Sequence, residues 1–181
     1  MSLFKTDKIH SAFGPSFTTE ILEQFQKGAA GITSNIDWPD LALSIQDVMA
    51  GIFARAVKEA YFKKIKIPIN RDLVVELLDE PDEVLHLGER AHKPIRGHVL
   101  KNELILLQQL KKFENLYKRV DNIKSFAALD EVMRNFGQLI VRDFKYEMGD
   151  VENWFKQGFE RQMREQKKLR DEVTLQRVAR M

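Results

Sequence analysis

Three of the four histidines in this chain lie within 13 positions, as His86, His92 and His98. Two of them end a Glu-x-x-His pair, formed by Glu83 with His86 and by Glu89 with His92. On a helix, this spacing places a carboxylate and an imidazole on the same face. Both groups can bind metal ions, so the segment is the first candidate for a metal site.

The arrangement of these pairs limits the metal chemistry that they could perform. Di-iron carboxylate bundles also use two Glu-x-x-His pairs, but theirs come from different helices. Here the pairs are six residues apart on one short segment that precedes Pro94, so they cannot hold two metal ions from opposite sides. A single ion could take two ligands from Glu83 and His86. The alternative is a charged helix rim with ordinary surface histidines, and we therefore predict no cofactor.

The sequence contains none of the common hydrolase or nucleotide-binding motifs. There is no Gly-x-Ser-x-Gly elbow, no His-Glu-x-x-His pair and no phosphate-binding Gly-x-x-x-x-Gly-Lys-Ser/Thr loop. The run from Gly28 to Gly31 lacks the preceding strand that a dinucleotide-binding fingerprint requires. The sequence therefore favours a protein that is not an enzyme.

The C-terminal region is a better candidate for a functional surface. It begins with aromatic residues, whereas residues 159–181 are mostly polar and carry a net charge of +3. A helix this polar gains little from packing on its own domain, so it could project into solvent or pair with a partner. The apolar residues predicted to contact that partner are Phe159, Met163, Leu169 and Val173.

Two other interpretations of this region remain open. The charges could form i,i+4 pairs on a solvated terminal helix. The basic side could instead contact the phosphates of a nucleic acid, although four acidic residues are interleaved with the basic ones. The candidate nucleic-acid contacts are Arg161, Arg164, Lys167 and Lys168.

The positions of the prolines indicate which elements carry these candidates. All five prolines precede Ile95, and the following 87 residues contain none, which is typical of long helices. Asp37, Ser125 and Asp150 are placed to cap helices. Gly51, inside a predicted helix, suggests close approach of a neighbouring helix. Long helices are predicted at 39–64, 95–120, 125–148 and 150–178, and short ones at 18–27 (capped by Thr18 or Thr19), 70–79 and 81–91.

The composition sets the class of the protein. Hydrophobic residues make up 44 % of the 181, which is enough for a core, and the net charge is only +2. There is no cysteine, and no apolar run approaches the roughly 18–20 residues that a membrane-spanning helix needs. These features predict a soluble, cytoplasmic protein without a transmembrane segment.

Together these patterns predict an all-α bundle of about four long and two or three short helices, with a long charged C-terminal helix. We expect an irregular leader at 1–17, a bundle domain at 18–158 and an extension of the last helix at 159–181. The function that fits is a non-enzymatic interaction protein, such as an adaptor, a chaperone-like factor or an assembly subunit, with a protein partner or a second copy. Nucleic-acid binding is the alternative, and a metal-dependent enzyme is a more remote one.

Overall fold

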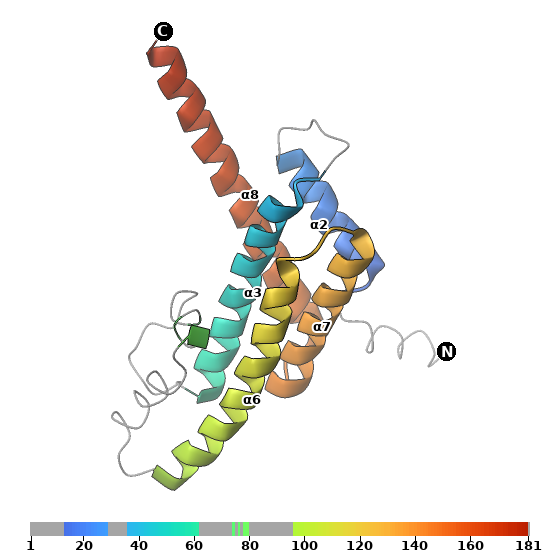
Figure 1. Cartoon of the computed structure of the whole chain (residues 1–181), viewed down its shortest axis with the longest axis vertical. Helices are drawn as coiled ribbons and strands as arrows, with labels where there is room; N and C mark the ends of the chain where they lie inside the picture. Colours follow the sequence, from blue (N-terminus) through green and yellow to red (C-terminus); the bar gives the residue numbers. More distant parts are fainter. Residues whose placement is uncertain are drawn as a thin grey trace.

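The computed structural model describes residues 13–28, 36–61, 74, 76, 78–79 and 96–180. Within these residues the chain is all-α and has no strand, which confirms the predicted fold class (Figure 1). The predicted helix at 81–91 lies outside the described residues, and of the one at 70–79 only four residues are described, all helical. The helices are α2 (Pro15–Gly28), α3 (Trp38–Tyr61), α6 (Arg96–Val120), α7 (Phe126–Phe144) and α8 (Met148–Ala179).

The predicted caps hold for two helices. The Asp37 carboxylate accepts a hydrogen bond from the backbone N–H of Asp40 at 3.2 Å, and the Ser125 hydroxyl accepts one from Ala128 at 3.2 Å. The cap predicted at Asp150 is wrong, because α8 already begins at Met148 and Asp150 lies in its first turn. Helix α7 ends earlier than predicted because Lys145 adopts the left-handed conformation, with φ at 59°.

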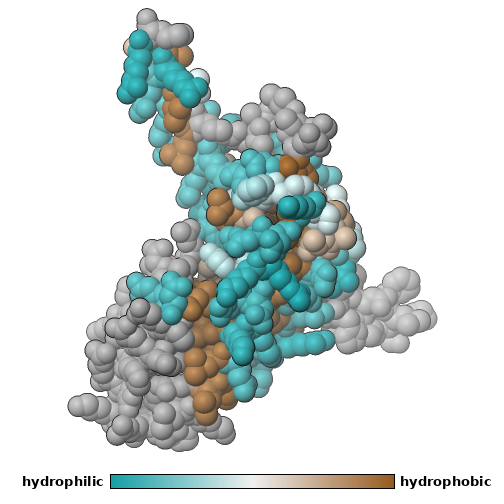
Figure 2. Space-filling view, viewed as in Figure 1, coloured by the Kyte–Doolittle hydropathy of each residue, from teal (hydrophilic) through white to brown (hydrophobic). Residues whose placement is uncertain are grey.

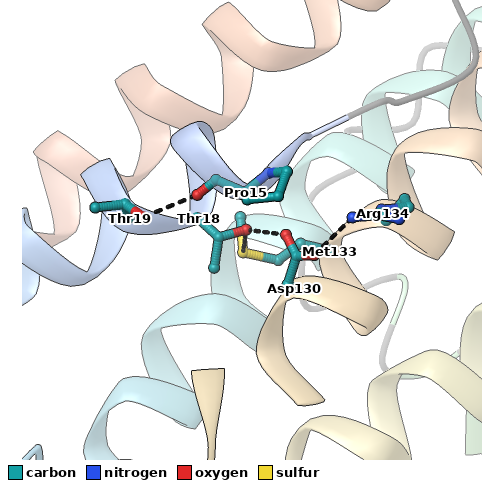
Figure 3. Close-up of polar contacts among 6 residues, drawn as sticks. All are labelled: Pro15, Thr18, Thr19, Asp130, Met133 and Arg134. Atoms are coloured by element: carbon teal, nitrogen blue, oxygen red, sulfur yellow. Dashed lines mark hydrogen bonds and ion pairs between the residues drawn. The ribbon is translucent and has the colours of Figure 1, made fainter. Parts of the chain in front are cut away.

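The predicted start of α2 at Thr18 is also wrong. The helix starts at Pro15, whose fixed φ suits the first helical position, and the carbonyl of Gly14 accepts from the N–H of Phe17. Thr18 therefore lies inside the helix, fully buried. Its hydroxyl donates at 2.7 Å to Asp130 of α7, which also pairs with Arg134 at 2.7 Å (Figure 3). This buried contact fixes α2 against α7, since a carboxylate inside the protein requires such partners.

Among the residues whose burial is described, helix α3 carries the most buried side chains, and it packs against α6, α7 and α8. Its Phe53 is fully buried and stacks on Phe113 of α6, with ring centres 4.3 Å apart. Phe144 of α7 meets the same ring edge-on at 5.6 Å. Three helices therefore meet at Phe53, which places this residue at the centre of the core.

A second aromatic cluster attaches the start of the described chain to α8. Phe13 is fully buried and lies 4.6 Å from Phe17 and 5.4 Å from Phe155, measured between ring centres. Phe155 in turn faces Phe159 at 6.5 Å. Part of the segment predicted as an irregular leader therefore packs on the body, at Phe13 and Phe17, and the cluster holds the first half of α8 inside the domain.

Candidate interaction surface

Helix α8 is the longest helix in the described part of the chain, and its C-terminal half extends away from the other helices (Figure 1). The contacts of α8 with α3 extend along α8 to two glutamines, Gln162 and Gln166. The Gln162 amide donates to Asp47, and the Gln166 amide donates to the Ser44 hydroxyl at 3.0 Å. We call residues 167–180 the α8 extension.

The α8 extension exposes large apolar side chains along its length. Leu169 and Leu175 are 61 % and 68 % exposed, and Val173 and Val178 are also exposed. Figure 2 shows hydrophobic side chains on the projecting part of this helix, between hydrophilic ones. Leu169 and Val173 were both predicted to contact a partner, and the structure leaves them accessible to one.

The other two residues predicted to contact a partner are placed differently. Phe159 is fully buried and Met163 nearly so, and both belong to the domain core. Their assignment as partner-binding residues is therefore corrected: α2 and α3 extend far enough to cover this part of α8. Packing of α8 on its own domain continues beyond Phe159, the residue at which the polar part of the sequence begins.

The four predicted nucleic-acid contacts, Arg161, Arg164, Lys167 and Lys168, are all exposed on α8. Four carboxylates are exposed on the same part of the helix: Glu160, Glu165, Asp171 and Glu172. The basic side chains thus do not form an uninterrupted positive surface. The balance of charge is closer to an alternating pattern than to the basic stripe that is typical of phosphate recognition.

A groove of about 440 Å³ lies between α3 and α8, beside the start of the extension. The two helices come close at Gly158, where an added Cβ would lie 3.2 Å from the Val48 side chain. Gly51 also lines the groove, but an added Cβ there would meet nothing within 4 Å. The predicted close approach at Gly51 is therefore wrong; Gly158 has that role, and Gly51 keeps the groove open.

One end of the groove is lined by Arg55 and Trp154, which belong to an aromatic and ionic cluster. The guanidinium of Arg55 lies 4.1 Å from the centre of the Trp154 ring, and Tyr146 meets the same ring edge-on at 5.0 Å. The Tyr146 hydroxyl donates to the Glu59 carboxylate, which also pairs with Arg55 at 3.6 Å. Burial, followed by the hydrogen bond and the charge of Glu59, raises the pKa of Tyr146 to about 12.

This raised pKa predicts a loss of stability at high pH. Between pH 10 and about 12 the folded chain keeps the Tyr146 proton and the unfolded chain has lost it, so the free energy of unfolding falls as the pH rises. Below pH 10 Tyr146 is protonated in both states, so its full contribution to the free energy of unfolding is present. We expect Tyr146→Phe to flatten this decline in urea titrations between pH 9 and 12. An identical decline in the variant would contradict this assignment.

Groove residues such as Arg55 and Gly158 were not among the predicted site residues, because only the packing of α3 on α8 brings them together.

The candidate metal ligands Glu83, His86, Glu89 and His92 lie outside the described residues, so that hypothesis stays a prediction. Within the described ranges, no three His, Asp or Glu side chains are grouped as a metal site requires. None of the described helices is both long and apolar enough to span a membrane.

Comparison with known proteins gives no relative from which a function could be transferred. No family model, no curated protein and no solved structure matches the chain. The surface of α8 and the groove beside it therefore remain the basis for assigning a function.

Proposed function

We propose that the protein is a non-enzymatic interaction protein that binds its partner through the α8 extension and the adjoining groove. The observation that supports this most is the exposure of Leu169, Val173, Leu175 and Val178 on a helix that continues beyond its own bundle. Burial of one such side chain contributes about 1.5–3 kcal/mol, so covering several of them would favour association. A reducing compartment such as the cytoplasm is part of this proposal, supported by the absence of cysteine.

The physical state of the extension supports the same proposal. An isolated helix of this length is marginal in water, and most helix stability in proteins comes from packing of an apolar face. The Gln166 amide still bonds to α3, whereas the large apolar side chains of the extension are exposed. A partner that covers those side chains would therefore stabilise the helix as well as bind it.

The proposal is tested by quantitative affinity capture from an extract of the source organism. The bait is the full chain, compared with a chain that ends after Lys167 and with the double variant Leu169→Glu, Val173→Glu. We expect at least one protein other than the chain itself to be enriched on the full chain and reduced at least tenfold on both variants. Equal recovery on all three baits would contradict the proposal.

Nucleic-acid binding is the alternative function, supported by the exposure of Arg161, Arg164, Lys167 and Lys168. The same capture distinguishes it, because a nucleic-acid partner is removed by nuclease and released steeply by salt. Replacing the four basic residues with alanine would then abolish capture, whereas the Leu169 and Val173 variant would retain it. The interleaved carboxylates make us favour the protein partner.

A further inference from the structure

One stripe along α8 carries charges that alternate in sign. Arg161, Glu165, Lys168 and Glu172 follow one another at steps of four, three and four residues, so they share one side of the helix. All four are exposed, and none forms an ion pair or a hydrogen bond with a described residue. We call these four residues the charge stripe. Its charges are therefore open to a partner.

The same side of the helix carries a recess at the start of the charge stripe, lined also by Arg161 and Glu165, and an apolar projection after the stripe. Gly158 precedes Arg161 by three residues and lines the groove together with Gly51. Leu175 follows Glu172 by three residues and is 68 % exposed. Trp154 precedes Gly158 by four residues, and Ala179 follows Leu175 by four residues, so they continue the same side of the helix at its two ends. The full series is Trp154, Gly158, Arg161, Glu165, Lys168, Glu172, Leu175 and Ala179.

This series is complementary to itself when it runs in the opposite direction. Its steps of 4, 3, 4, 3, 4, 3 and 4 residues are symmetric about a point between Gln166 and Lys167. We propose that α8 also binds a second copy of this chain, antiparallel and in this register; this inference rests on the function proposed above and leaves Leu169 and Val173, which are not in the series, to the captured protein. Arg161 then faces Glu172 of the second copy, Glu165 faces Lys168, and Leu175 enters the groove at Gly158.

The shape of the molecule agrees with this orientation. The symmetry point lies next to Gln166, whose amide bonds to Ser44 of α3, and every side chain of α8 described after Gln166 is exposed. Each extension would therefore lie along the packed half of the other α8, in the groove between α3 and α8. A two-fold contact of this kind buries the same residues on both copies. A parallel arrangement in register would instead place Arg161 against Arg161 and Glu165 against Glu165.

The two parts of this interface have different roles. Exposed ion pairs between long side chains contribute little net affinity, so the charge stripe mainly selects the antiparallel orientation and the register. Contact of Leu175 with the apolar part of the groove, at Val48, Gly51 and Gly158, supplies the affinity and occurs twice in the dimer. Leu43 is exposed on α3 one turn before Asp47, a groove residue, and lies near the level of the symmetry point.

The test is absolute molar mass in solution by light scattering over a range of protein concentrations, with the full chain. We expect a dimer of the wild-type chain, and a dissociation constant at least tenfold higher for Arg161→Glu or for Glu172→Lys alone. The combination of Arg161→Glu with Glu172→Lys restores the facing pair and should return the constant to within about threefold of wild type. The matched control combines Arg161→Glu with Glu165→Lys: its net charge is the same, but like charges then face each other at both positions, so it should stay dissociated.

A second variant tests the groove without disturbing the fold. Gly51→Gln fills the groove at a position where nothing lies within 4 Å of an added Cβ, and glutamine favours helix more than glycine does. We expect an unchanged or higher melting temperature together with a weakened dimer. A wild-type chain that stays monomeric at 500 µM, or two double variants that behave alike, would overturn the self-association. Neither result would affect the capture of another protein, so failure of this inference is distinguishable from failure of the proposed function.

Discussion

A chain that ends after Gln157 is expected to lose its cooperative unfolding transition. The missing residues include Phe159 and Met163, which are buried in the core. Truncating such residues to alanine already costs about 3–5 kcal/mol for phenylalanine and 2–5 for methionine, and the contacts of Gln162 and Gln166 with α3 are lost as well. The sum approaches the entire stability of a domain of this size, which is about 5–15 kcal/mol.

The matched control is a chain that ends ten residues later, after Lys167. It keeps every contact between α8 and the bundle described above, so its free energy of unfolding should lie within about 1 kcal/mol of the full chain. Urea denaturation followed by circular dichroism and by tryptophan fluorescence measures both chains. Cooperative unfolding of the shorter chain would show that the packed part of α8 ends before Phe159.

The helices were largely predictable from the sequence because their apolar spacing records which side is buried. In α3, for example, apolar residues recur at steps of four, three and four residues, and all of them are buried: Leu41, Ile45, Val48 and Ile52. The wrong predictions concern helix ends, where a residue that could cap the helix can also lie inside it. Thr18 is a residue type that often caps helices, but here its hydroxyl donates a hydrogen bond to Asp130 of α7, which is distant in the sequence. Lysine is not a residue that favours the left-handed conformation, as glycine does. The end of α7 at Lys145 could therefore not be predicted from the residue type at that position.

The candidate site was predictable only in part. Leu169 and Val173 could be selected because apolar residues within a polar helix need an explanation. The boundary between packed and projecting parts could not be located, since it depends on where α2 and α3 begin and end beside α8. The groove is harder still: Gly51 and Gly158 are 107 positions apart, and nothing local to either distinguishes the one that meets Val48 from the one that does not.

Phe53→Ala is expected to lower the free energy of unfolding by about 3–5 kcal/mol. The ring is fully buried, stacks on Phe113 and meets Phe144 edge-on, so its removal leaves a cavity where α3, α6 and α7 meet. Aromatic pairs of this geometry contribute about 0.5–1.5 kcal/mol beyond the area that they bury. Urea denaturation of the isolated protein, at a concentration below that of any self-association, provides the measurement.

The same substitution at a more exposed phenylalanine shows how much of the effect comes from lost core packing and how much from changing phenylalanine to alanine. Phe126, the first residue of α7, is 39 % exposed, so Phe126→Ala removes an identical group with much less loss of packing. A change of about 1 kcal/mol is expected there, within the range of ordinary point substitutions. Equal effects at the two positions would contradict a core centred on Phe53. A large effect at Phe53 that leaves the affinity of α8 for its partner intact would show that the bundle serves as a scaffold and that binding resides on α8 and its groove.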